Sequence, residues 1–244
     1  MEENPPAIMN LANLQKTWSQ SGFQLGPVNL TLPAGATLAV LGKNGSGKTT
    51  LFQLMTGNLD PDAGTILFQG RKFTPESFDQ KRQIGYLPQH LELPHWVTGS
   101  EILTYATRLY QIPDPTRHVE ETLTYWDSEG FRNKPLASCS HGMQKRIALG
   151  LAGIHDPDLL ILDEPFSGLD LYHIRALENL IRHRSDTGKA TIVCTHIAPY
   201  AARLCEEAMI METGRCTPLE GWQQKSWPDR IRLMEDSFFP TGEN

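Results

Sequence analysis

The amino-acid sequence predicts an α/β fold, a mostly parallel β-sheet covered by helices, with an inserted helical subdomain. Three continuously apolar runs, residues 37–41, 159–162 and 191–194, are typical of strands buried on both faces. Segments with apolar residues at helical spacing separate these runs, and such alternation implies a parallel sheet with helices on both faces. Residues 90–140 show helical patterns and no strand pattern, which indicates the insertion.

The chain before the insertion predicts two strands and a helix. Val28, Leu30 and Leu32 alternate with polar residues, which predicts a half-buried strand ending at the Pro-Ala-Gly turn of residues 33–35. The buried strand 37–41 then runs directly into a glycine-rich turn. A helix with Leu51, Leu54 and Met55 at i, i+3 and i+4 is expected after the turn, with Gly57 as its end.

Two helices are expected in the insertion. Ser100 is the expected N-cap of the first, whose apolar face would consist of Ile102, Ala106, Leu109 and Tyr110. Pro113 and Pro115 interrupt the pattern, and a second helix follows through Val119 and Leu123. The apolar residues of the segment 91–97 either contact a partner helix or pack within the subdomain.

From Met143 the alternation of helices and strands resumes. A helix with Ile147, Leu151 and Ile154 precedes the strand 159–162, and a helix with Ile174, Leu177 and Ile181 precedes the strand 191–194. A last strand is expected near residues 209–211. In the tail, residues 215–244, an apolar stripe predicts a helix that packs on the domain or docks a partner; it consists of Trp227, Ile231, Met234 and Phe238.

Composition and charge exclude several function classes. The 244 residues carry 22 Lys+Arg against 28 Asp+Glu, a net charge of −6, and no basic run, so no nucleic-acid partner is expected. The longest uncharged apolar stretch is seven residues, 148–154, whereas a membrane-spanning helix needs about 20. The beginning of the chain lacks the pattern of a secretory signal, and the four cysteines form no CxxC pair, so a reducing compartment is expected.

Residues 42–49 form a phosphate-binding motif, G-x-x-x-x-G-K-[ST]. Glycines let consecutive backbone N–H groups point at a polyphosphate, and the following helix directs its positive N-terminus at the same anion. Lys48 is expected to reach the β- and γ-phosphates and the Thr49 hydroxyl to ligate Mg²⁺. The expected nucleotide-binding residues of this segment are Gly42, Asn44, Gly45, Ser46, Gly47, Lys48, Thr49 and Thr50.

A second acidic site follows the strand 159–162. Asp163, at the end of this apolar run, is expected to hold Mg²⁺ through water. Glu164 can polarise an attacking water as a general base. A guanine-nucleotide enzyme is excluded, because the segment Asn-Lys-Pro-Leu at residues 133–136 lacks the aspartate of the N-K-x-D base reader.

With these motifs in this order, the sequence resembles the nucleotide-binding subunits of ATP-binding-cassette (ABC) transporters over residues 8–214. The resemblance implies the P-loop NTPase fold, with a RecA-like, mostly parallel core and an antiparallel β portion, and it implies ATP and Mg²⁺ as the ligands. The segment 84–89, Ile-Gly-Tyr-Leu-Pro-Gln, looks like the family's Q-loop. Gln89 would then contact Mg²⁺ near the γ-phosphate.

Residues 139–143, Cys-Ser-His-Gly-Met, stand where the family has its LSGGQ signature, and Ser140 and Gly142 match it. In the family this helix end binds the γ-phosphate of the ATP held by the opposite subunit; Ser140 is also a good helix N-cap in its own right. His141 and Met143 depart from LSGGQ in a way similar to the drug- and polysaccharide-export branch. Asp170 resembles the D-loop aspartate between the two subunits, and it can equally cap the next helix.

Two further residues follow from the resemblance alone. His196, just after the strand 191–194, matches the switch histidine that bonds the γ-phosphate and orients Glu164. Trp18 stands where the family places the aromatic that stacks on adenine, although Phe23 is close enough to take this role.

The resemblance also implies partners. Two ATPase subunits, expected to be identical, would pair head to tail around two ATP·Mg²⁺ and drive separate integral membrane permease subunits. The chain would then lie peripherally on the cytoplasmic face of the inner (plasma) membrane, with export favoured over import. The alternative is an ABC ATPase that acts on ribosomes or DNA, which the net charge of −6 disfavours.

Overall fold

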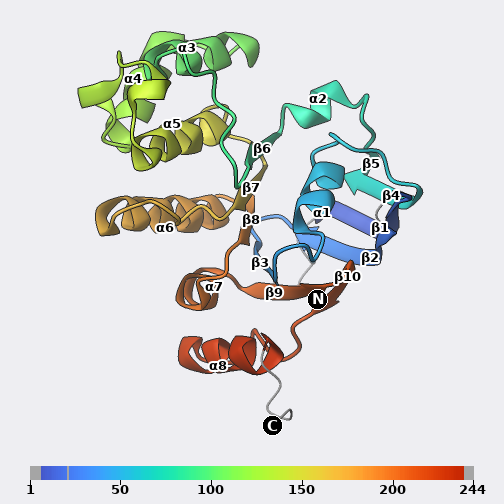
Figure 1. Cartoon of the computed structure of the whole chain (residues 1–244). Helices are drawn as coiled ribbons and strands as arrows, with labels where there is room; N and C mark the ends of the chain where they lie inside the picture. Colours follow the sequence, from blue (N-terminus) through green and yellow to red (C-terminus); the bar gives the residue numbers. More distant parts are fainter. Residues whose placement is uncertain (1–6, 21, 239–244) are drawn as a thin grey trace.

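The computed structural model describes residues 7–20 and 22–238, which form two sheets with helices around them (Figure 1). The larger sheet has the strand order β10-β9-β3-β8-β7-β6. Its strands are β3 (Thr37–Gly42), β6 (Ile84–Leu87), β7 (Leu159–Asp163), β8 (Ala190–Cys194), β9 (Glu207–Glu212) and β10 (Arg215–Pro218). The smaller sheet, of order β2-β1-β4-β5, contains β1 (Ala7–Trp18), β2 (Phe23–Pro33), β4 (Ala63–Phe68) and β5 (Arg71–Lys72).

The larger sheet confirms the predicted α/β class. Its strand pairs are all parallel except β9 with β10, which pair antiparallel at the edge. Every residue of β7 and β8 is buried, as expected of strands covered on both faces. Because β8 lies between β3 and β7, Cys194 is the register partner of both Val40 and Asp163. The carboxyl ends of these three strands therefore meet at one edge, where open α/β sheets bind ligands.

The antiparallel sheet was only partly predicted from the sequence. The alternation of Val28, Leu30 and Leu32 does belong to a strand, β2, but its central neighbour β1 was missed. Register shifts interrupt the pairing of β1 with both of its neighbours, between Leu11 and Leu14 on one side and between Ala12 and Gln15 on the other. These irregularities hide the period of two on which the prediction of a strand rests.

Helices cover both faces of the larger sheet (Figure 1). Helix α1 (Lys48–Met55) packs between the two sheets, since its buried side chains share one cluster with strands of both. The opposite face is covered by α5 (His141–Gly153), α6 (Leu171–Asp186), α7 (Ala198–Leu204) and α8 (Trp227–Phe238). The short helix α2 (Phe78–Lys81) precedes β6.

Within residues 90–140 the structure has helices α3 (Gly99–Leu109) and α4 (Pro115–Tyr125) and two 3₁₀ turns, Glu129–Phe131 and Leu136–Ser138. Two details of the prediction were wrong. The N-cap of α3 is Thr98, not Ser100, because Thr98 and Glu101 form a reciprocal capping box. The buried face of α3 contains Leu103 and Ala106, whereas Leu109 is exposed, because the residues that pack inward are Gly99, Leu103, Ala106 and Thr107, at helical spacing.

The tail helix α8 packs against α7. Met234 is buried there, while Trp227, the first residue of the predicted stripe, is exposed. Arg230 secures the helix by donating from Nη1 to the carbonyl oxygens of Ala202 and Cys205, each at 3.0 Å. The side chain of Phe238 and residues 239–244 lie outside the described part of the chain. Among the described residues, no helix combines the length and apolar character that crossing a bilayer requires.

Candidate active site

The phosphate-binding motif forms the loop between β3 and α1. Gly45 and Gly47 have φ angles of 79° and 108°, in the region that favours glycine. A Cβ on Gly47 would lie 2.8 Å from Cζ of Phe23, so the loop also needs glycine there for space. No side chain caps α1, which leaves the first backbone N–H groups of the helix free to bind an anion.

The loop lines an open cavity of about 470 Å³. Residues far apart in the sequence meet around it: Phe23, Asn44, Gly45, Gly47, Lys48, Thr49, Thr50, Gln89 and His90. The Lys48 ammonium lies across the loop and donates to the carbonyl oxygens of Gly42, at 2.7 Å, and Lys43, at 2.9 Å. The ammonium is therefore held at the cavity by two neutral acceptors, which an anionic phosphate can replace.

Two buried oxygen atoms beside the loop fit a Mg²⁺–phosphate ligand. Within the described residues, Oγ of Ser46 and Oδ1 of Asp163 are buried without a hydrogen-bond partner. Burial raises the pKa of Asp163, and the adjacent Glu164 carboxylate adds to this, whereas the ammonium groups of Lys48 and Lys145 act in the opposite direction. A carboxylate that is costly to bury and lacks a partner on one oxygen suits a divalent cation. Thr49 and Gln89 supply further oxygen atoms at the neighbouring cavity.

Glu164 is held in a strained and specific position. Its backbone φ angle is 48°, in the left-handed region that residues other than glycine rarely adopt. This backbone conformation costs about 1–3 kcal/mol. Oε1 accepts a bond from the backbone N–H of His196, at 3.1 Å, and lies 2.9 Å from Nδ1 of its ring; Oε2 accepts one from the Thr195 hydroxyl, at 3.3 Å. The Glu164 side chain is largely buried, whereas that of His196 is exposed.

Lys145 and Thr195 were missed by the sequence prediction. Lys145 is 1% exposed and lies within electrostatic reach of Asp163 and Glu164. Burial lowers its pKa, and the two carboxylates oppose that change. One signal was available: Lys145 is three and four residues before Ala148 and Leu149, which face the sheet, so it shares their buried side of α5.

Ser140, Gly142 and Asp170 form a second group outside this cavity. Ser140 caps α5 by accepting from the backbone N–H of Met143, at 3.3 Å, and Asp170 caps α6 by accepting from that of His173, at 3.0 Å. The two helix starts touch, because a Cβ on Gly142 would lie 2.6 Å from the carbonyl oxygen of Gly168. The described residues therefore place the predicted site residues in two separate groups.

Phe23 and Trp18 are register partners at the end of the β1–β2 hairpin, so both rings stand on the same side of the sheet. Only Phe23 is among the residues that line the phosphate-loop cavity. We expect Phe23→Ala to weaken ATP binding about 5- to 100-fold, the usual range for losing a base–aromatic stack, and Trp18→Ala to weaken it less. Equilibrium titration with a fluorescent ATP analogue measures both variants. A loss confined to Trp18→Ala would restore Trp18 as the adenine-stacking residue.

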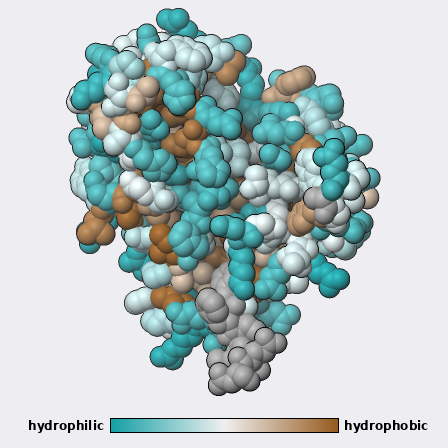
Figure 2. Space-filling model, in the orientation of Figure 1, coloured by the Kyte–Doolittle hydropathy of each residue, from teal (hydrophilic) through white to brown (hydrophobic). Residues whose placement is uncertain are grey.

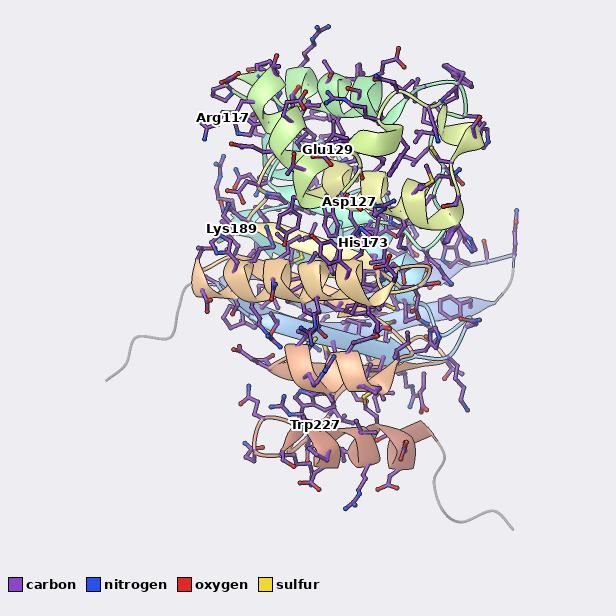
Figure 3. All side chains as sticks on the ribbon, turned by 90° about the vertical axis from the view of Figure 1, so that its left-hand side faces the viewer. Arg117, Asp127, Glu129, His173, Lys189 and Trp227 are labelled. Carbon is purple, nitrogen blue, oxygen red and sulfur yellow. The ribbon has the colours of Figure 1, made fainter. Side chains whose placement is uncertain are left out.

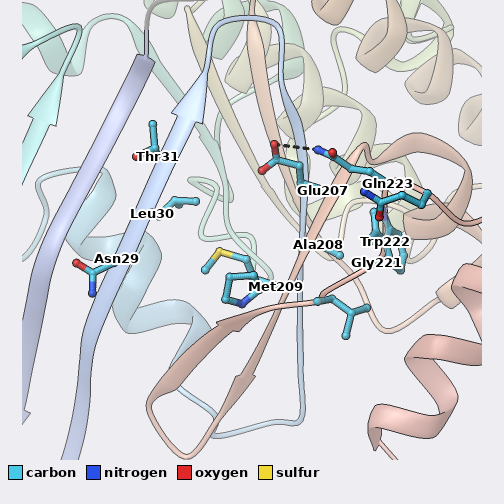
Figure 4. Close-up of a pocket in the computed structure, with 12 residues that line it drawn as sticks. Asn29, Leu30, Thr31, Glu207, Ala208, Met209, Gly221, Trp222 and Gln223 are labelled. Atoms are coloured by element: carbon cyan, nitrogen blue, oxygen red, sulfur yellow. Dashed lines mark hydrogen bonds between the residues drawn. The ribbon is translucent and has the colours of Figure 1, made fainter. Parts of the chain in front are cut away.

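A cavity of about 310 Å³ elsewhere is not part of this site (Figure 4). It lies between β2, β9 and the segment after β10, with Asn29, Glu207 and Trp222 among its lining residues. Burial raises the pKa of Glu207, and the amide of Gln223 donates to its Oε1 at 3.4 Å. None of the predicted site residues lines this cavity.

Comparison with known proteins agrees with this fold. Residues 25–167 match the ABC transporter family. The chain is 33% identical over 211 residues to the Nod factor export ATP-binding protein I of Sinorhizobium fredii, which covers 85% of this chain and 61% of that protein. It is 35% identical to the taurine import ATP-binding protein of Pelagibacter ubique, over 77% of this chain and 70% of that one. A solved structure described as the ATP binding subunit of an ABC transporter superposes with a TM-score of 0.82 at 25% identity, covering 93% and 99% of the two chains.

Proposed function

Because the chain belongs to the ABC transporter family, we propose that it is an ATP-binding and ATP-hydrolysing subunit that drives transport through separate membrane subunits. One observation carries the proposal. The Glu164–His196 pair, with a 2.9 Å contact, lies just past the carboxyl ends of β7 and β8. Asp163 ends β7, and β3, which pairs with β8, leads into the Lys48 loop. A base, a cation ligand and a phosphate-binding loop are the parts that ATP hydrolysis requires.

Each part has a proposed role. Backbone N–H groups of the loop, Lys48 and the start of α1 bind the phosphates, with Asn44, Ser46 and Thr50 as further loop contacts. Thr49, Gln89 and Asp163 hold Mg²⁺, which when bound neutralises charge that develops on the phosphate oxygens. Glu164 accepts the proton of the attacking water. His196 holds Glu164 through Oε1, and its exposed side chain can also bond a phosphate oxygen.

A second copy of the chain is proposed to complete each site. Ser140, Gly142 and Asp170 lie outside the chain's own phosphate-loop cavity, and Ser140 is exposed. The N-terminus of α5 can therefore act as an anion-binding end for a nucleotide held by another subunit. Head-to-tail pairing of two identical chains would bring this end to the partner's Lys48 loop in both sites at once.

The proposed contact with the membrane subunits is a groove of about 410 Å³ between α3, α5 and the segment that follows β6. Its lining contains Leu91 and Leu93, and Tyr105 and Leu109 of α3 are 66% and 54% exposed at its rim. Figure 2 shows exposed hydrophobic groups on the side of the molecule that holds the helices. Because Pro88 lines this groove and the next residue, Gln89, lines the nucleotide cavity, this short stretch can transmit closure to a docked helix.

Location and direction of transport follow from the same proposal. The chain would be a peripheral component on the cytoplasmic face of the membrane. Export is the proposed direction, supported by the Nod factor export relative and by the His141 and Met143 departures, while the taurine import relative favours the opposite direction.

Isolation of the membrane partner tests this proposal. A tagged Glu164→Gln chain is expressed in its own host, the membranes are solubilised gently with ATP·Mg²⁺, and the proteins retained at stoichiometric level are identified. We expect a polytopic membrane protein, lost when Tyr105 and Leu109 are both changed to Glu. It should be retained in the control Phe78→Glu, in which an equally exposed ring, 71%, lies on α2 outside the groove. Recovery of ribosomes or DNA alone would contradict the transport role.

A further inference from the structure

The start of α6 is joined to α5 through the buried side chain of His173. Nδ1 of His173 lies 2.7 Å from Oδ1 of Asp170, and Nε2 lies 3.0 Å from Nη1 of Arg146 on α5. His173 is 6% exposed. Figure 3 shows it between α6 and the segment with Asp127, whose carboxylate Oδ2 lies 4.0 Å from Nε2. The imidazole thus connects three parts of the chain.

The chemistry of this chain of contacts determines where the imidazole proton lies. A guanidinium has only donors, so Nε2 of His173 must be the acceptor in its bond with Arg146. The proton is then on Nδ1, which donates to the Asp170 carboxylate. Besides His173 Nε2, Arg146 Nη1 contacts the carbonyl oxygens of Asp127, at 2.5 Å, and Trp126, at 3.2 Å, and Oδ2 of Asp127, at 3.4 Å. The Arg146 guanidinium itself lies over the Phe131 ring, 4.7 Å from its centroid.

A second contact joins the starts of α5 and α6 at the residues next to Ser140. A Cβ on Gly168 would lie 2.7 Å from Cδ2 of His141, and Gly142 approaches the Gly168 carbonyl oxygen as closely. Further along α6, the Tyr125 hydroxyl donates to the carbonyl oxygen of Ala176 at 2.7 Å. The first turns of α6 are therefore attached to α5 and to the end of α4 through three contacts: His173 with Arg146, Gly168 with the start of α5, and Ala176 with Tyr125.

We propose that His173 is a positioning residue that makes Asp170 and the Ser140–Gly142 segment one rigid unit. This inference rests on the proposed function, since the unit is the half-site offered to the partner's nucleotide. The bonds from Arg146 to His173 and from His173 to Asp170 set the position of the Asp170 carboxylate relative to the α5 N-terminus. The same bonds connect this half-site to the Asp127 carbonyl in the helical part of the chain. A half-site that is already rigid loses less conformational freedom when two subunits pair, so pairing is more favourable.

The tautomer of His173 is the first test, and it needs neither ATP nor a partner. Long-range ¹H–¹⁵N NMR of the histidine-labelled protein distinguishes the two neutral tautomers, and the signal lost in His173→Asn identifies the residue. We expect the Nδ1–H form. An Nε2–H form would break the bond from Arg146 and overturn the proposal, whatever the protein's activity.

The second test asks whether His173 and Arg146 act together on pairing. ATP-dependent dimerisation of Glu164→Gln protein is measured by light scattering for His173→Asn, Arg146→Gln and the double variant. The Asn amide can still donate to Asp170, but the shorter side chain cannot also place its oxygen where Nε2 of His173 meets Arg146. Each single change should weaken dimerisation about 10- to 200-fold, as expected for one lost charge-assisted bond, and the double change should cost no more than one single change.

ATP affinity of the monomer should change less than about twofold in these variants, because the Lys48 cavity contains neither residue. His183→Asn, at the exposed far end of α6, is the matched control and should dimerise normally. Losses that multiply in the double variant would show that the two residues act independently and would overturn the proposal. If the parent protein neither binds ATP nor dimerises, the proposed function fails instead, and the tautomer still reports separately on the bond network.

Discussion

Glu164→Gln is expected to lower the rate of ATP hydrolysis by about 10²–10⁴-fold, the range for losing a general base, with ATP affinity retained. An amide has the shape of the carboxyl group but cannot accept the proton of the attacking water. Its carbonyl oxygen can still accept the bond from the His196 backbone N–H, so the position of the side chain is kept. Phosphate release at saturating ATP and equilibrium ATP binding measure the two quantities.

The matched control for this substitution is Glu212→Gln, which makes the same chemical change at an exposed residue that ends β9. It should hydrolyse ATP at the parent rate. Dimers of the Glu164→Gln protein should accumulate with ATP, because the step that separates them is blocked. Normal hydrolysis by Glu164→Gln would show that another group takes the proton, and the assignment of the base would be wrong.

Lys48→Ala is expected to weaken ATP binding about 10- to 200-fold, which corresponds to one lost bond between charged groups. The Lys48 ammonium already lies at the loop, where it donates to the carbonyl oxygens of Gly42 and Lys43, so it needs little rearrangement to bond a phosphate. Isothermal titration with ATP·Mg²⁺ measures the loss. The salt dependence of binding should fall as well, since one cation no longer faces the polyphosphate.

Lys72→Ala is the control for this second substitution, because Lys72 is an exposed lysine on β5 and does not line the nucleotide cavity. Its ATP affinity should equal that of the parent. The melting temperature of Lys48→Ala should stay near the parent value, since the lost bonds are to partly exposed carbonyl groups. Unchanged ATP affinity in a folded Lys48→Ala protein would remove this loop from the proposed site.

Local sequence was sufficient where one physical effect dominates. The runs at 37–41, 159–162 and 191–194 are short and have no exposed polar face, which is typical of buried strands, and each of them is one. The glycines and Lys48 of the loop lie between a strand and a helix, as the motif requires. By contrast, β1 was missed because irregular pairing hides its period, and the α3 cap was misplaced because Thr98 and Ser100 are both good capping residues.

By itself, the sequence determined the α/β class, the phosphate loop and the acidic strand end, because each depends on residues that are close together along the chain. Only the tertiary structure decided which distant groups meet. It placed His196 on Glu164, Phe23 beside Gly47, and His173 on Arg146 of α5. These contacts join residues on separate elements, and their geometry is set by sheet order and helix packing, which no local pattern encodes.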